Sequence, residues 1–148
     1  MVGDVQWTVA KKLISLLQVA LPGVTVTAFD PGDEQADQHV WIESIVSTDV
    51  DIPTLRNPAQ PFSQDDFFDI NLAFVVGVAG DHDATHEAVA AIVAGINNLV
   101  LDDPTFGAQF AVLMASVTDK ARRVIDTKTA GYIGQGGVVV NVHARLTD

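Results

Sequence analysis

Apolar side chains recur at helical spacing in two segments of the chain. The first segment ends at Pro22-Gly23, and the second runs from about residue 84 to 100, before Asp102-Asp103-Pro104. The stripe of the first segment consists of Trp7, Ala10, Leu13, Ile14, Leu17 and Leu21, and that of the second of Val89, Ile92, Val93, Ile96, Leu99 and Val100. Steps of three and four residues place each set on one face of a helix. We therefore predict two amphipathic helices, the first capped by Asp4.

Alternating or β-rich runs predict five strands, beginning with 24–29 and 39–47. Residues 68–78 alternate without a break and predict a long strand with one buried face, and 138–146 predict the last strand. On 39–47 we expect Val40, Ile42 and Val46 to share a face. The segment 110–126 predicts a bent strand, with Phe110, Val112 and Met114 on one side and Leu113, Ala115 and Val117 on the other. On the last strand we expect Val138, Val140, Val142 and Leu146 on one face, and Asn141, His143 and Arg145 on the other.

Three connecting segments fit neither period. Residues 30–38 form an acidic loop, and Gly131 to Gly137 read as a glycine-rich turn. Residues 48–66, with Pro53, Pro58 and Pro61, predict a loop of a length that is unusual in a compact domain.

The element order predicts an α+β fold in a single domain covering residues 1–148. It is a mainly antiparallel β-sheet with two α-helices packed on one face and a long loop between strands 2 and 3. The open face of that sheet must meet solvent or a partner.

Composition narrows the functional classes. The chain has 148 residues, of which 48% are hydrophobic and 18% charged, so it should fold as one domain. It has no cysteine, which excludes disulfides, thiolate metal sites and a cysteine nucleophile. The net charge of -11 disfavours a protein that grips nucleic-acid phosphates. No signal peptide or membrane span is predicted from the pattern.

Two motifs resemble binding sites, one for a metal ion and one for a phosphate group, but a structural role explains both better. His82 and His86 stand four residues apart, as on a metal-binding helix, but no third ligand follows. We also expect His82 to lie at or before the helix start, where its ring need not share a face with His86. Gly134-Gln135-Gly136-Gly137 looks like a phosphate loop but leads into a strand, which favours a hairpin turn. We predict no metal site, no catalytic residue, no cofactor and no enzymatic activity.

Charge is distributed unevenly along the chain. Residues 1–119 hold 17 acidic and 3 basic residues, whereas residues 120–148 hold 2 acidic and 5 basic ones. The basic cluster contains Lys120, Arg122, Arg123 and Lys128. It indicates pairing with acidic residues of the same chain, a solvated face, or a heterologous interface between subunits.

Apolar residues also gather in and beside the long loop. They include Leu55, Pro61, Phe62, Phe67 and Phe68. Such residues either contact a partner or fold back over the sheet edge.

The layout of the whole chain resembles the tail-terminator family of long-tailed bacteriophages. The resemblance lies in the helix ending at Leu21-Pro22-Gly23, the strand pair, the proline-containing excursion at 48–66, the long strand leading into the helix at 83–100, and the C-terminal strand pair. It implies a structural virion protein at the neck of the tail, assembled in the host cytoplasm. It further implies a homo-oligomeric ring, a hexamer, that caps the tail tube, ends its polymerisation and offers a docking surface to the head-side connector.

The implied partners are further copies of this chain, the major tail tube protein and the head–tail connector or head-closure protein. DNA would pass through the lumen without specific binding, and no membrane is involved. Candidate interface residues are Leu55, Phe62, Phe67, Lys120, Arg122, Arg123, Lys128 and Tyr132, the last within the glycine-rich turn that we expect at the axis. The alternatives are another neck or tail-completion protein, such as a head-closure or minor tail protein, and a small bacterial ligand-binding module.

Overall fold

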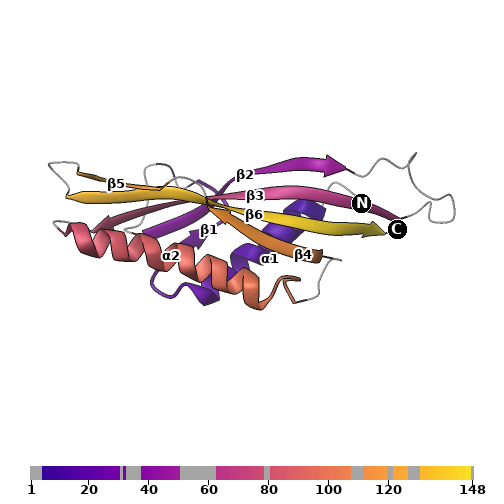
Figure 1. The fold of residues 1–148 in the computed structure, drawn as a ribbon, viewed down its shortest axis with the longest axis horizontal. Coiled ribbons are helices and arrows are strands. Elements are labelled where there is room, and N and C mark those ends of the chain that lie inside the picture. Colours follow the sequence, from indigo (N-terminus) through magenta and orange to yellow (C-terminus); the bar gives the residue numbers. More distant parts are fainter. Residues whose placement is uncertain are drawn as a thin grey trace.

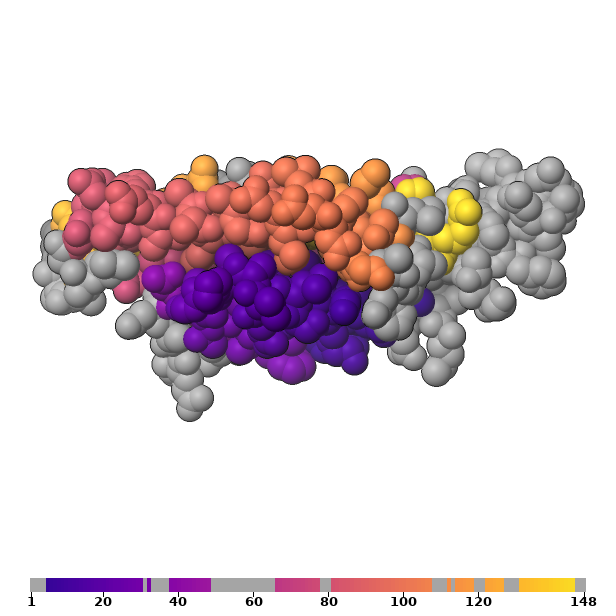
Figure 2. Space-filling view, turned by 90° about the horizontal axis from the view of Figure 1, so that it is seen from below, coloured from indigo at the N-terminus to yellow at the C-terminus, as the bar shows by residue number. Residues whose placement is uncertain are grey.

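The chain folds into a β-sheet covered on one face by two helices (Figure 1). The structure is a computed structural model that describes residues 5–30, 32, 38–50, 63–78, 81–107, 112–119, 122–126 and 131–147. In chain order the elements are α1 (Val5–Ala20), β1 (Thr25–Thr27), β2 (Gln38–Val50), β3 (Ser63–Val78), α2 (His82–Asp102), β4 (Val112–Asp119), β5 (Arg123–Asp126) and β6 (Tyr132–Thr147). The predicted α+β class is confirmed, and Figure 2 shows α1 and α2 side by side on the covered face.

The strand order is β1-β2-β3-β6-β4, with β5 also beside β6. Among the described strands every pairing is antiparallel except that of β1 with β2, which is parallel. β4 pairs with the C-terminal half of β6, and β5 pairs with its N-terminal half. The predicted bent strand at 110–126 is therefore two strands that follow one another along the same neighbour.

The core lies between the sheet and the helices. Alternation along β3 buries Phe68, Ile70, Leu72, Phe74 and Val76, and β6 contributes Val138, Val140, Val142 and Ala144 to the same layer. From the helices come Val9, Ala10, Leu13, Ile14 and Leu17 of α1, and Val89, Ile92, Val93, Ile96 and Val100 of α2. By length and composition α2 could cross a membrane, but its apolar stripe packs into this core, as that of a core helix does.

Helix ends follow their capping residues. Asp81 caps α2, and its Oδ1 accepts a hydrogen bond from the backbone N–H of Ala84 at 3.0 Å. The cap starts the helix at His82, two residues before the predicted start. Beyond α1, Gly23 has a φ of 82°, a conformation that suits glycine at a helix C-terminus. Asp4, the predicted cap of α1, lies outside the described residues.

Two β-bulges correct the predicted faces of β2 and β4. The register of β2 against β3 shifts between Ile42 and Ser44, so Val46 points to the open face and is 49% exposed. Ile45 takes the inward position instead. A second shift separates Val112, which is buried, from Met114, which is 56% exposed, although we expected these two residues on one face.

The predicted glycine-rich turn at 131–137 is wrong, because β6 already begins at Tyr132. Gly134 and Gly136 are strand residues at points of close approach. A Cβ on Gly134 would meet the side chains of Val89 and Thr85 on α2, and a Cβ on Gly136 would lie 2.9 Å from Phe74 Cζ. These glycines let other elements pack on β6, and only Gly131, with a φ of 83°, needs a turn conformation.

The predicted loop at 48–66 is too long at both ends. β2 continues to Val50 and β3 begins at Ser63, so residues 48–50 and 63–66 belong to strands. Residues 51–62, between the two strands, lie outside the described part of the chain, as does Phe110.

Candidate assembly interface

The face of the sheet away from the helices carries two grooves. Alternation directs Trp41 of β2, Val75 of β3 and Gln135 of β6 to this open face at one end. At the other end it directs Phe67 and His143 there. Gln135 and His143 are eight positions apart on β6. At the spacing of residues along a strand, the two ends are therefore separated by about 27 Å.

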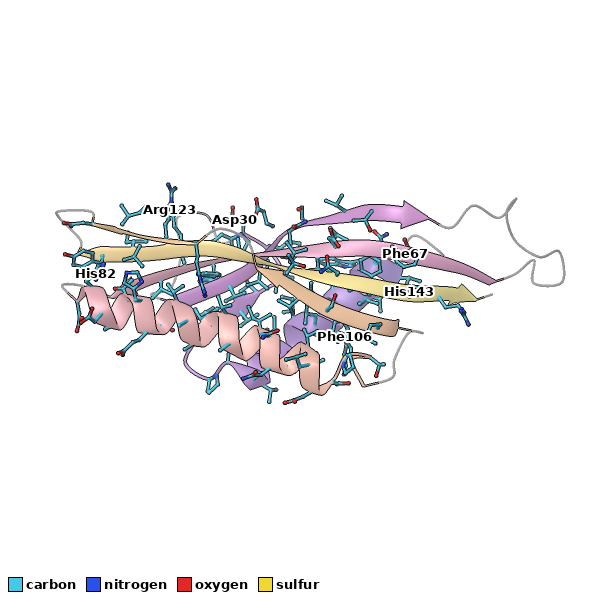
Figure 3. The ribbon with its side chains drawn as sticks, viewed as in Figure 1. Asp30, Phe67, His82, Phe106, Arg123 and His143 are labelled. Atoms are coloured by element: carbon cyan, nitrogen blue, oxygen red, sulfur yellow. The ribbon has the colours of Figure 1, made fainter. Side chains whose placement is uncertain are left out.

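The first groove has a volume of about 780 Å³ and combines an apolar floor with charged walls. It is lined by Asp30, Trp41, Glu43, Ala73, Phe74, Val75, Arg122, Arg123, Ile133, Gln135 and Gly136. Arg122 and Arg123 are exposed, and Figure 3 shows Arg123 and Asp30 on the side of the sheet away from α2. An exposed apolar surface with opposite charges on its walls can bind a polypeptide surface of matching charge.

His39 lies beside this groove at the junction of β1 and β2 and is 3% exposed. Thr27 Oγ1 donates its proton to the carbonyl oxygen of Phe29 at 2.8 Å. The same oxygen therefore accepts a hydrogen bond from His39 Nε2, also at 2.8 Å. Burial lowers the pKa of His39, and the negative charge of Asp30 opposes part of that change. The folded chain therefore favours neutral His39.

The second groove, of about 410 Å³, contains a stacked aromatic pair. The rings of Phe67 and His143 lie 4.2 Å apart at an angle of 17°. The groove is lined by Thr48, Phe67, Asp69, Met114, Ser116, Asn141, Val142 and His143. Sequence reasoning selected Phe67 but missed His143 and Met114 as its neighbours. The alternation of β6 already placed His143 on the polar face and could have found it.

The two histidine rings of α2 do share a face of the helix. His82 is the first helical residue, and its Nε2 lies 3.1 Å from Nε2 of His86. The ring of Tyr132 meets His82 edge-on at 4.9 Å. Both histidines are exposed. Among the described residues no third histidine, cysteine or carboxylate joins them in a group that could hold a metal ion.

The structure places four of the eight candidate interface residues. Arg122 and Arg123 lie at the first groove and Phe67 at the second, while Tyr132 lies on the helix side beside His82. It does not bring these four together in one patch. Leu55, Phe62, Lys120 and Lys128 lie outside the described residues. An interface role for all eight stays a prediction.

Comparison with solved structures shows that this fold occurs in other proteins. No family model matches the chain, and no curated protein matches its sequence. The fold is similar to a chain in the solved structure described as "Virion of native gene transfer agent (GTA) particle". The TM-score is 0.53 at 11% identity, and the match covers 92% of this chain and 91% of the other. At that identity the similarity shows a common fold.

Proposed function

We propose that this chain is a structural protein of a phage-like virion, located at the neck of the tail. In this proposal its copies form a hexameric ring that caps the tail tube and ends its polymerisation. The outer surface of the ring then receives the head-side connector. The major tail tube protein, the connector or head-closure protein, and further copies of this chain are its partners.

The fold match is the observation that carries the proposal. It extends over nine tenths of both chains, so the whole domain, rather than a common substructure, is similar to a chain of a virion particle. The same element order carries the resemblance to tail terminators found in the sequence. Fold alone does not determine function, and the surface must therefore support the same role.

The surface supports assembly. The open face of the sheet has exposed apolar side chains, including Val46 and Met114, at one end and the exposed Arg123 at the other. In a ring, surfaces of this kind contact neighbouring copies or adjoining rings. The net charge of -11 suits a channel through which DNA moves, because like charges prevent it from adhering.

The experiment adds the purified chain to polymerising tail tube protein from the same genome and measures tube lengths by electron microscopy. We expect growth to stop and a labelled chain to sit at one end of each tube. The double charge reversal Arg122→Glu with Arg123→Glu serves as the control. It should fold normally but should neither assemble nor stop tube growth. Unchanged tube lengths and bare ends would contradict the proposal. Binding to connector rings alone would instead favour a head-closure protein.

A further inference from the structure

The sheet has two outer edges that lack a strand partner among the described residues. β1 covers β2 only at His39–Trp41, so the outer edge of β2 is unpaired from Ile42 to Val50. At the opposite side of the sheet, β4 pairs with β6 along one edge, and its other edge is unpaired from Val112 to Asp119 (Figure 1). Unpaired edges present backbone N–H and C=O groups that can pair with another chain.

The two unpaired edges lie at the same level of the sheet. The registers can be followed from β2 through β3 and β6 to β4, residue by residue. One such row is Val46, Asp69, Asn141 and Ser116, and another is Ser44, Asn71, Val139 and Thr118. Both rows lie on the open face. The unpaired part of β2 and the whole of β4 therefore span the same height.

The two edges also have opposite polarity. β2, β3, β6 and β4 are joined by three antiparallel pairings, so β4 runs opposite to β2. A second copy, rotated so that its β2 lies beside β4 of the first, continues the antiparallel order. Contact between two different edges is heterologous, and repeated heterologous contacts close into a ring when the rotation between copies permits it.

The side chains at both edges suit pairing. Ser44–Thr48 and Met114–Thr118 contain no charged residue and no proline. Edge strands that must stay unpaired usually carry lysine or proline for protection. Val46 and Met114 are 49% and 56% exposed, and they would come close to one another across the junction. The bulges that flank Ser44–Ser47 on β2 bend the strand, as strands at the rims of curved sheets do.

Charge complementarity favours the same neighbour. β5 extends the line of β4, and Arg123 is level with His39, which pairs with Thr25 of β1. At this level β1 of the next copy must therefore lie outside β5, so the two sheets diverge there and the arginines of one copy face β1 of the next. The described residue Asp30 follows β1 and carries a negative charge. Opposite charges at this position would fix which edge meets which.

We propose that β4 of each copy pairs antiparallel with the unpaired edge of β2 in the next copy, so that one β-sheet continues around the ring. The inference rests on the proposed ring-forming function and names its subunit interface. The sheet edges, rather than the faces of the helices, hold the copies together.

Cysteine cross-linking tests this pairing directly, because the chain has no cysteine of its own. Val46→Cys and Ser116→Cys are exposed substitutions in one row. We expect a short bis-methanethiosulfonate, which forms a disulfide with each cysteine thiolate and releases methanesulfinate, to link the two variants when they are mixed, and neither variant to link to itself. Since the register across the junction can slide by one residue pair, Met114→Cys and Thr118→Cys complete the scan. Circular dichroism on each variant verifies folding.

Asn141→Cys is the matched control, since it lies in the same row on the same face but in the interior of the sheet. It should not link to Val46→Cys. Self-linking of Val46→Cys or Ser116→Cys alone would overturn the proposal, because it indicates a two-fold pairing of like edges. A ring-sized mass in light scattering without any cross-link would refute the proposed β4–β2 interface but not the proposed ring-forming function. Monomers without cross-links, with tube ends also bare, would overturn both.

Discussion

Gly134 allows the close approach of α2 to β6, and replacing it with alanine should destabilise the domain. A Cβ at this position would collide with Val89 Cγ2 and lie 3.3 Å from Thr85 Cγ2. Neither neighbour can turn away easily. Val89 is branched and 4% exposed. Thr85 is fixed by its hydroxyl, which donates to the carbonyl oxygen of Asp81 at 2.8 Å.

The magnitude follows from two opposing terms. Overpacking a core by one methyl group costs about 1–3 kcal/mol. Because Gly134 does not have a positive φ, alanine fits its backbone and recovers about 0.4–1 kcal/mol by restricting the unfolded chain. The expected net loss for Gly134→Ala is about 1–2 kcal/mol, or about 2–8 °C in melting temperature for a chain of this size.

Urea denaturation of a double-mutant cycle tests the origin of this loss. Val89→Ala alone should cost about 2 kcal/mol through lost burial and a cavity. The double variant Gly134→Ala/Val89→Ala should lose about 1 kcal/mol less than the sum, because the new methyl group fills that cavity. Additive effects, or an unchanged stability of Gly134→Ala, would refute the close approach.

Because folding lowers the pKa of His39, the unfolded chain binds a proton at a higher pH than the folded chain does. The free energy of unfolding should therefore decrease as the pH drops below about 6.5. Urea denaturation at several pH values should show a smaller decrease for His39→Gln. Gln6→Ala should lower the free energy of unfolding by about 1–3 kcal/mol in urea denaturation. The reason is that Gln6 Nε2 donates a hydrogen bond to Asp66 Oδ2 at 3.0 Å, and Asp66 is only 5% exposed. An unchanged free energy of unfolding would mean that solvent replaces the donor. Arg122→Glu with Arg123→Glu should leave the melting temperature nearly unchanged while abolishing assembly in light scattering, and retained assembly would remove the arginines from the interface.

Periodicity predicted the layers of this fold because burial is strongly one-sided. The uninterrupted alternation of residues 68–76 and the two helical stripes identify the core, and the alternating set on β3 is buried. The faces predicted from periodicity were wrong where one extra residue, at a β-bulge, shifts the alternation. The bulges of β2 and β4 reverse the faces of Val46 and Met114, and nothing in the local composition marks a bulge. The glycines of β6 looked like a turn because the residues that need them, Val89 and Phe74, are distant in sequence.

The candidate interface was predictable only in part. The arginine pair follows from the uneven charge, and Phe67 from its position beside the long alternating strand. The sheet edges could not be predicted, because pairing order is a property of the tertiary structure. The segments Ser44–Thr48 and Met114–Thr118 look like ordinary strands until the sheet order places both at its margins.

In the proposed function, copies of this chain form a closed ring. The most direct measurement is the native mass by light scattering, with negative-stain images of the same sample, recorded with and without tail tubes. We expect a hexamer of about 94 kDa, from chains of 15.7 kDa, with a central hole, and the same ring on tube ends. A species of 15.7 kDa in both samples, with bare tube ends, would contradict it.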